Sequence, residues 1–105
     1  MSYSLSTDAA SGVHALSGEL GIYTVPDIRQ QVLALFAAAD NIDIDLSGVT
    51  EIDTAGLQLM LMTKREQGKQ VRFCNHSQVV LKLIDLANLG QTLGDPVFIS
   101  ARSDT

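Results

Sequence analysis

The hydrophobic pattern is clearest in the middle of the chain, where Ile42, Ile44 and Leu46 alternate with Asp43 and Asp45. A period of two is typical of a strand that is buried on one face only. The pattern therefore predicts a strand whose two aspartates point away from the helices that cover its other face.

A helix is expected soon after this strand, beyond a short loop at 48–53. It opens at residues 53–56, and its apolar residues lie all round it, so we expect it to pack against the sheet and its neighbours. Lys64 and Arg65 suit the negative C-terminal end of a helix, and Gly68 is placed to end it.

The other elements alternate between strand and helix along the chain. They are a hairpin of residues 3–7 and 13–17, a helix at 24–39, a strand at 70–75, a helix from Ser77 to its stop at Gly90, a turn at 94–96 and a short apolar segment at 97–99. Thr24 and Ser77 are expected to cap their helices through the side-chain hydroxyl.

Strands that alternate with helices in the order β-β-α-β-α-β-α predict an α/β sandwich, with a four- to five-stranded mixed sheet. Alternating rather than continuous apolar runs indicate that helices cover one face of the sheet only. Arg72 should then lie on the open face, opposite Asp43 or Asp45. The length predicts a single domain over residues 1–105, with a core at about 3–99.

Composition and charge argue against several classes of protein. Hydrophobic residues make up 46% of the chain and charged residues 18%, as in ordinary globular proteins. The net charge of −5 argues against nucleic acid or an anionic membrane surface as the main partner. No segment reaches the ~20 apolar residues of a membrane span, and the N-terminus lacks a signal-peptide pattern. We expect a cytoplasmic protein, a monomer or weak dimer, without direct membrane insertion.

Candidate catalytic chemistry is sparse. The chain has no nucleophile elbow and no phosphate-binding glycine loop. Cys74 and His76 are too few to form a metal site, and the single cysteine cannot form an internal disulfide. Asp43 and Asp45 do not converge with Asp53 on one cleft, as acid–base catalysis requires. The sequence therefore predicts no enzyme, no catalytic residue, no cofactor and no metal.

Thr54 has two interpretations. The simpler one is a helix cap, worth ~1 kcal/mol, because its hydroxyl can satisfy a free backbone N–H group. In the other, the hydroxyl is also phosphorylated, since a helix N-terminus favours anions. A phosphate would add about −1.5 to −2 charge, enough to abolish docking of a close-packed partner.

The run DLSGVTEIDTAGLQLML, residues 45–61, resembles the signature of the STAS domain. This family includes bacterial anti-sigma factor antagonists and the cytoplasmic domains of sulfate transporters. Residues 16–20, LSGEL, resemble its G-E-L segment after the second strand, and residues 73–89 resemble its closing strand-helix unit. The likeness covers roughly residues 3–90 and implies a STAS-type sandwich.

The resemblance also implies a function. In antagonist members a partner kinase phosphorylates the residue after the motif Asp, and here that residue is Thr54. This implies a non-enzymatic module that binds a kinase-type anti-sigma factor, or a similar serine/threonine kinase regulator, and is switched by phosphorylation. Gly21 stands where many antagonists carry an acidic residue, which puts the contact usually made there in doubt.

Two alternatives keep the fold. The run D-T-A-G-L also resembles the STAS subunit of bacterial phospholipid-transport ABC complexes, which docks on the ATPase subunit through this helix. Free-standing STAS proteins also occur as adaptors in chemosensory signalling.

The partner is expected to bind near the C-terminal end of the central strand, where open α/β sheets place their functional crevices. The expected contact residues are Asp53, Thr54, Ala55, Gly56, Thr50 and Tyr23. Tyr23 is included because Tyr is enriched at interface hot spots. Ile22 either joins this surface or tucks under the first helix. Arg29 and Lys82 are expected on remote solvated faces.

Overall fold

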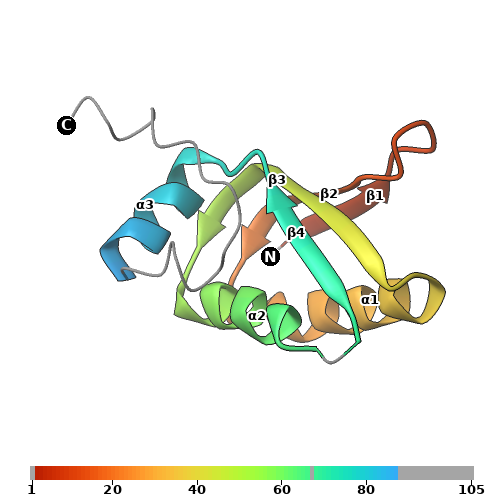
Figure 1. Ribbon diagram of the computed structural model, residues 1–105. Helices are drawn as coiled ribbons and strands as arrows, with labels where there is room; N and C mark the ends of the chain where they lie inside the picture. Colours follow the sequence, from red (N-terminus) through yellow and green to blue (C-terminus); the bar gives the residue numbers. More distant parts are fainter. Residues whose placement is uncertain (1, 67, 88–105) are drawn as a thin grey trace.

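The computed structural model describes residues 2–66 and 68–87, which form the helices and strands of Figure 1. They are β1 (Tyr3–Thr7), β2 (His14–Leu20), α1 (Val25–Ala38), β3 (Asn41–Ile52), α2 (Thr54–Lys64), β4 (Gln70–Cys74) and α3 (Gln78–Ala87). This is the element order that the sequence predicts. The expected stop at Gly90, the turn at 94–96 and the apolar segment at 97–99 lie outside the described residues.

The sheet is mixed, as predicted, with the order β1-β2-β3-β4. β1 and β2 form an antiparallel hairpin, whereas β2, β3 and β4 run parallel. α1 and α2 lie side by side on one face (Figure 1). β4 pairs only with residues 41–45 of β3, so β3 continues past it, and α3 packs beside this extension. Two C-terminal strand ends, those of β2 and β3, therefore come together next to the start of α2.

One hydrophobic core lies between the sheet and the helices. Its buried residues are Leu16, Leu20, Ile28, Val32, Phe36, Ile42, Ile44, Leu46, Val49, Leu57, Leu59, Met60, Val71, Phe73, Val80 and Ile84. Burying a side chain of this size contributes about 1.5–3 kcal/mol, so the core is the main source of stability. The predicted inward face of the central strand, Ile42, Ile44 and Leu46, is confirmed.

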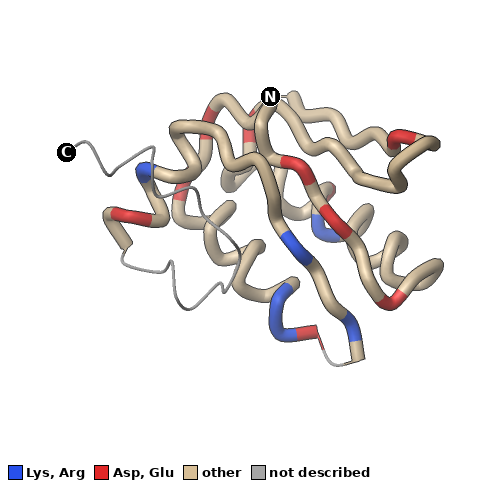
Figure 2. Tube along the Cα trace, turned by 45° about the horizontal axis from the view of Figure 1, so that its top comes forward, with Lys and Arg blue, Asp and Glu red and all other residues tan. Residues whose placement is uncertain are grey.

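The open face of the sheet carries the predicted pairing of acid and base. Asp43 lies opposite Arg72 in the parallel register, and Arg72 Nε is 3.5 Å from Asp43 Oδ1. Figure 2 shows the acidic positions of β3 beside a basic position of β4. Partial burial raises the pKa of Asp45, but hydrogen bonds from Ser47 and Asn75 outweigh it and hold the pKa below its ordinary value.

The expected loop at 48–53 is wrong, because β3 runs on to Ile52. The register between β2 and β3 shifts twice. Ala15 lies opposite Asp45 but Ser17 lies opposite Gly48, and Gly18 lies opposite Val49 but Glu19 lies opposite Glu51. An extra residue on one strand is a β-bulge, and it breaks the alternation of inward and outward side chains. The strand therefore continues where its sequence pattern stops.

The two expected side-chain caps and the expected stop at Gly68 need correction, although α1 and α3 begin where predicted. Thr24 is the N-cap residue of α1 but makes no side-chain cap hydrogen bond. Ser77 precedes α3, but its Oγ is buried without a hydrogen-bond partner among the described residues. α2 ends at Lys64 with Arg65 as its C-cap, so Gly68, with a φ of +75°, belongs to the turn before β4.

Candidate functional site

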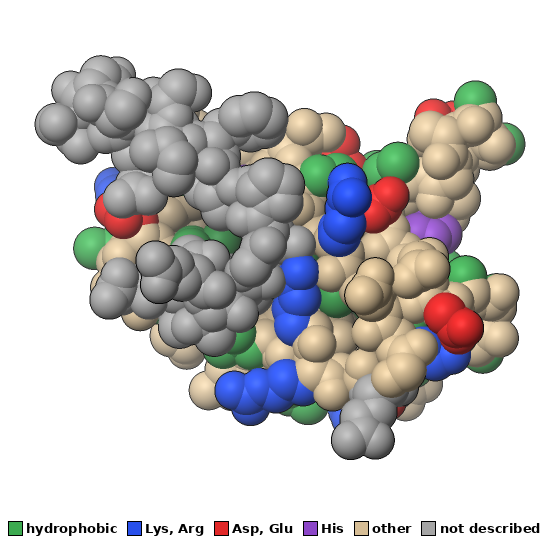
Figure 3. Space-filling model, in the orientation of Figure 1, with side chains coloured by type: hydrophobic (Ala, Val, Ile, Leu, Met, Phe, Trp, Pro, Cys, Tyr) green, Lys and Arg blue, Asp and Glu red, His purple; other side chains and the backbone are tan. Residues whose placement is uncertain are grey.

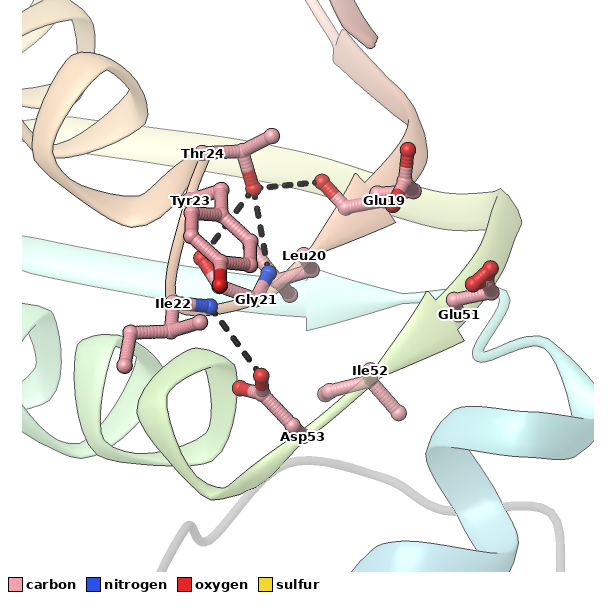
Figure 4. Close-up of a pocket in the computed structure, with 9 residues that line it drawn as sticks. All are labelled: Glu19, Leu20, Gly21, Ile22, Tyr23, Thr24, Glu51, Ile52 and Asp53. Atoms are coloured by element: carbon pink, nitrogen blue, oxygen red, sulfur yellow. Dashed lines mark hydrogen bonds between the residues drawn. The ribbon is translucent and has the colours of Figure 1, made fainter. Parts of the chain in front are cut away.

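The junction of β3 and α2 is built around the carboxylate of Asp53. Its Oδ1 accepts the backbone N–H groups of Ala55, at 2.9 Å, and Gly56, at 3.2 Å. Its Oδ2 accepts the N–H of Ile22 at 3.0 Å. Figure 4 shows this last bond across the space between the end of β3 and the segment after β2. One side chain thus caps α2 and holds a distant segment beside it.

Asp53, and not Thr54, is therefore the N-cap of α2. Thr54 is the first residue of the helix, and its side chain is exposed. The interpretation of Thr54 as the cap is wrong, because the residue before it already satisfies the free amides. The Thr54 hydroxyl is accessible and is not required to begin the helix.

Two glycines allow the close approach around Asp53. A Cβ at Gly56 would collide with the carbonyl oxygen of Leu20, so only glycine lets α2 start against β2. A Cβ at Gly21 would lie 2.8 Å from Asp53 Oδ2. Gly56 is buried and serves this packing, so it is not part of the exposed surface, whereas Ala55 is half-buried.

A cleft of about 300 Å³ lies between the ends of β2 and β3 (Figure 4). It is lined by Glu19, Leu20, Gly21, Ile22, Tyr23, Thr24, Glu51, Ile52 and Asp53. Ile22 and Tyr23 are 63% and 77% exposed. The alternative that Ile22 tucks under the first helix is therefore wrong, and the structure brings both residues beside Asp53.

Thr24 fixes the segment from the other side. Its buried hydroxyl donates to the carbonyl oxygen of Glu19 at 2.7 Å and accepts the N–H of Gly21 at 3.0 Å. The side chain that the sequence suggested as a helix cap instead closes the turn between β2 and α1. The backbone beside Tyr23 is thereby held at two successive amides, Gly21 by Thr24 and Ile22 by Asp53.

Thr50 lies on the other side of the end of β3, in a second groove of about 430 Å³. The groove is lined by Thr50, Glu51, Ile52, Val79, Lys82, Leu83 and Leu86. The expectation that Lys82 lies on a remote face is therefore wrong, because α3 packs beside β3. Val79, Leu83 and Leu86 recur at helical spacing, a signal from which this partly exposed apolar stripe could have been found in the sequence. Arg29 lies elsewhere, between α1 and α2.

Acidic side chains line the cleft, whereas basic side chains gather at a different part of the surface. The described residues that line the cleft include Glu19, Glu51 and Asp53 but neither Lys nor Arg. On the face shown in Figure 3, basic side chains gather around β4 and the C-terminal end of α2. From Thr54 to Lys64 the helix rises about 15 Å, which exceeds the screening length of about 8 Å in physiological salt. New negative charge at Thr54 would not be neutralised by those residues.

Residues 2–66 and 68–87 contain no group of three or more His, Cys, Asp or Glu residues that could hold a metal ion. No helix in the same part is long and apolar enough to cross a membrane.

The family of the chain follows from its match to a family model described as "Mlab, STAS domain", which covers residues 4–97. The chain belongs to the STAS domain family. The predicted resemblance is thus confirmed, and in this STAS domain the signature residues 45–61 form the end of β3 and most of α2.

Known relatives agree with this assignment. The chain is 27% identical over 92 residues to the anti-sigma-B factor antagonist of Bacillus subtilis (strain 168), covering 85% of this chain and 81% of that protein. An anti-sigma factor antagonist from Mycobacterium paratuberculosis has a similar structure, with a TM-score of 0.72, 24% identity and coverage of 98% and 93%. The structure of SpoIIAA in its unphosphorylated form, also an anti-sigma factor antagonist, has a TM-score of 0.65 and 23% identity to this chain. The match covers 95% of this chain and 92% of that one. The two structures show that the fold is shared.

Proposed function

We propose that this STAS domain is a cytoplasmic, non-enzymatic regulator of the anti-sigma factor antagonist type. Unmodified, it binds a kinase-type anti-sigma factor or a similar serine/threonine kinase regulator, and phosphorylation of Thr54 releases it. The observation that carries the proposal is that Thr54 is exposed and does not cap α2, because Asp53 is the N-cap residue. The relative from Bacillus subtilis, named an anti-sigma-B factor antagonist, supports it.

The mechanism is electrostatic. A phosphate at the first residue of α2 is tolerated by the helix, because helix N-termini favour anions. It also adds about −1.5 to −2 charge beside a cleft that already carries carboxylates and no basic side chain. A partner that packs closely against this surface would have to bury that charge, and binding would weaken.

The proposed contact surface comprises Tyr23, Thr50, Asp53, Thr54 and Ala55. Tyr23 and Thr50 lie in the two grooves that flank the end of β3, and Thr54 follows directly after it. A partner that spans both grooves would cover Thr54. Gly56 supports this surface from below by letting α2 approach β2.

Binding measurements with the purified cognate anti-sigma factor test this proposal. Thr54→Glu should weaken the affinity more than about tenfold while the fold stays intact, whereas Thr54→Ala should still bind. Tyr23→Ala and Thr50→Ala should each impair binding more than Arg29→Ala, the matched control at the groove between α1 and α2. Wild-type affinity of Thr54→Glu would rule the switch out.

A second candidate is favoured by the description of the matching family, "Mlab, STAS domain". In this candidate the chain is the STAS subunit of a phospholipid-transport ABC complex and docks on its ATPase through α2. Stable co-purification with an ABC ATPase, disrupted by Thr54→Glu but without any phosphorylation of Thr54, would favour it over the antagonist.

A further inference from the structure

Asp53 connects two segments that are 31 residues apart in the sequence. One carboxylate oxygen accepts the first amides of α2, and the other accepts the amide of Ile22. Thr54 is covalently joined to this residue. The start of α2 and the position of the segment 21–23 therefore both depend on the Asp53 carboxylate.

The contact between Asp53 and this segment is tight. A Cβ on Gly21 would lie 2.8 Å from Asp53 Oδ2. Only glycine therefore lets the backbone approach the carboxylate this closely. Tyr23 is 77% exposed, so packing does little to fix its side chain. The position of Tyr23 depends instead on the backbone around it. The amides of Gly21 and Ile22 are bound by the side chains of Thr24 and Asp53, and the Gly21 carbonyl oxygen accepts the amides of Thr24 and Val25.

We propose that Asp53 is a positioning residue that couples Thr54 to Tyr23. Negative charge added at Thr54 repels the adjacent carboxylate and competes for the amides of Ala55 and Gly56, which a helix N-terminus offers to any nearby anion. The Asp53 side chain then shifts, its bond to Ile22 weakens and the backbone beside Tyr23 loses that restraint, while the bonds made by Thr24 remain. Modification of Thr54 would thus alter the cleft both at the end of β3 and at the segment after β2. The proposal rests on the proposed function only in taking Thr54 as the modified residue.

Asp53→Asn separates the two tasks of the carboxylate. The Asn oxygen still accepts the helix amides, and Asn caps helices as well as Asp does. Its nitrogen cannot accept the Ile22 N–H, so this bond alone is lost. Glu51→Gln is the matched control, because it removes the same charge from the same cleft while the Ile22 N–H keeps its acceptor.

The experiment is amide hydrogen exchange and ¹⁵N NMR on the isolated chain. Asp53→Asn should speed exchange of the Ile22 amide about tenfold while the Ala55 amide keeps its protection. Thr54→Glu should shift the Ile22 and Tyr23 amides and speed Ile22 exchange about threefold. In the Asp53→Asn background, Thr54→Glu should add no further change at Ile22 or Tyr23. Glu51→Gln should leave Ile22 exchange within about twofold of wild type and keep the full Thr54→Glu response.

The proposal is overturned if Asp53→Asn leaves Ile22 exchange unchanged, or if the effects of Thr54→Glu stay within α2. Persistence of the Thr54→Glu response without the carboxylate would also overturn it. Gly21→Ala is a second route to the same test, because its Cβ pushes Asp53 Oδ2 away and should also speed Ile22 exchange. No partner is present in these measurements, so their outcome is independent of whether Thr54 controls binding.

Discussion

Asp43 on the open face of β3 and Asp53 at its end are both carboxylates with access to solvent, but they bind different kinds of group. Asp43 faces the side chain of Arg72 at 3.5 Å, and the two side chains are 47% and 69% exposed. Asp53 accepts three backbone amides that belong to two separate segments. The first contact joins two exposed side chains, whereas in the second a side chain holds two segments of the main chain together.

This difference predicts which mutations will change the free energy of unfolding most. An exposed ion pair gains little, because water screens it and two long side chains lose freedom to form it. A carboxylate that accepts backbone amides satisfies donors that have no other partner and fixes the course of the chain. The end of β3 should therefore be far more sensitive than its open face, although both regions carry acids.

The largest expected effect is at Gly56, which lets α2 begin against β2. Gly56→Ala places a Cβ on the Leu20 carbonyl oxygen and should reduce the free energy of unfolding by about 3 kcal/mol in urea titrations. Gly68→Ala is the control, since nothing lies within 4 Å of its Cβ and only the positive φ opposes it, at a cost of about 1 kcal/mol. Equal losses at the two glycines would show that the approach of α2 to β2 is not tight.

A smaller loss is expected at Asp53. Asp53→Ala removes the helix cap and the bond to Ile22, and it should reduce the free energy of unfolding by about 2 kcal/mol. Thr54→Ala, one residue on, should change it by less than about 0.5 kcal/mol, because the exposed Thr54 does not cap the helix. The reverse order in urea unfolding would return the cap to Thr54.

The smallest effect is expected on the open face. Asp43→Asn should change the free energy of unfolding by about 0–1 kcal/mol, since its pairing with Arg72 is exposed. Any difference from wild type should shrink in about 1 M salt, where the screening length is near 3 Å. A loss as large as that of Asp53→Ala would remove the contrast between the two regions.

The open face could be predicted from the sequence. The alternation at residues 42–46 identified the inward and outward side chains, and the register of parallel strands then placed Arg72 opposite an acid. The order of strands and helices followed from the change between periods of two and 3.6. These features depend on the spacing of hydrophobic residues over short stretches of the chain, which can be read from a single sequence.

The end of β3 could be predicted only in outline. Its bulges hid the extension to Ile52, and Asp and Thr are both good caps, so neighbouring residues could not be told apart. The position of Lys82 beside Thr50 depends on how α3 crosses to β3. The bond between Asp53 and Ile22 joins residues whose closeness no local pattern records. Such long-range contacts require the three-dimensional structure.

The central claim is that Thr54 is the phosphorylated residue, and mass spectrometry tests it most directly. The purified chain would be incubated with ATP and its cognate kinase-type anti-sigma factor, and the intact mass measured. Wild type and the control Ser47→Ala, which lacks an exposed hydroxyl of β3 outside the proposed contact surface, should each gain a single phosphoryl group, and Thr54→Ala should gain none. Phosphorylation of Thr54→Ala to the same extent as wild type would contradict the account.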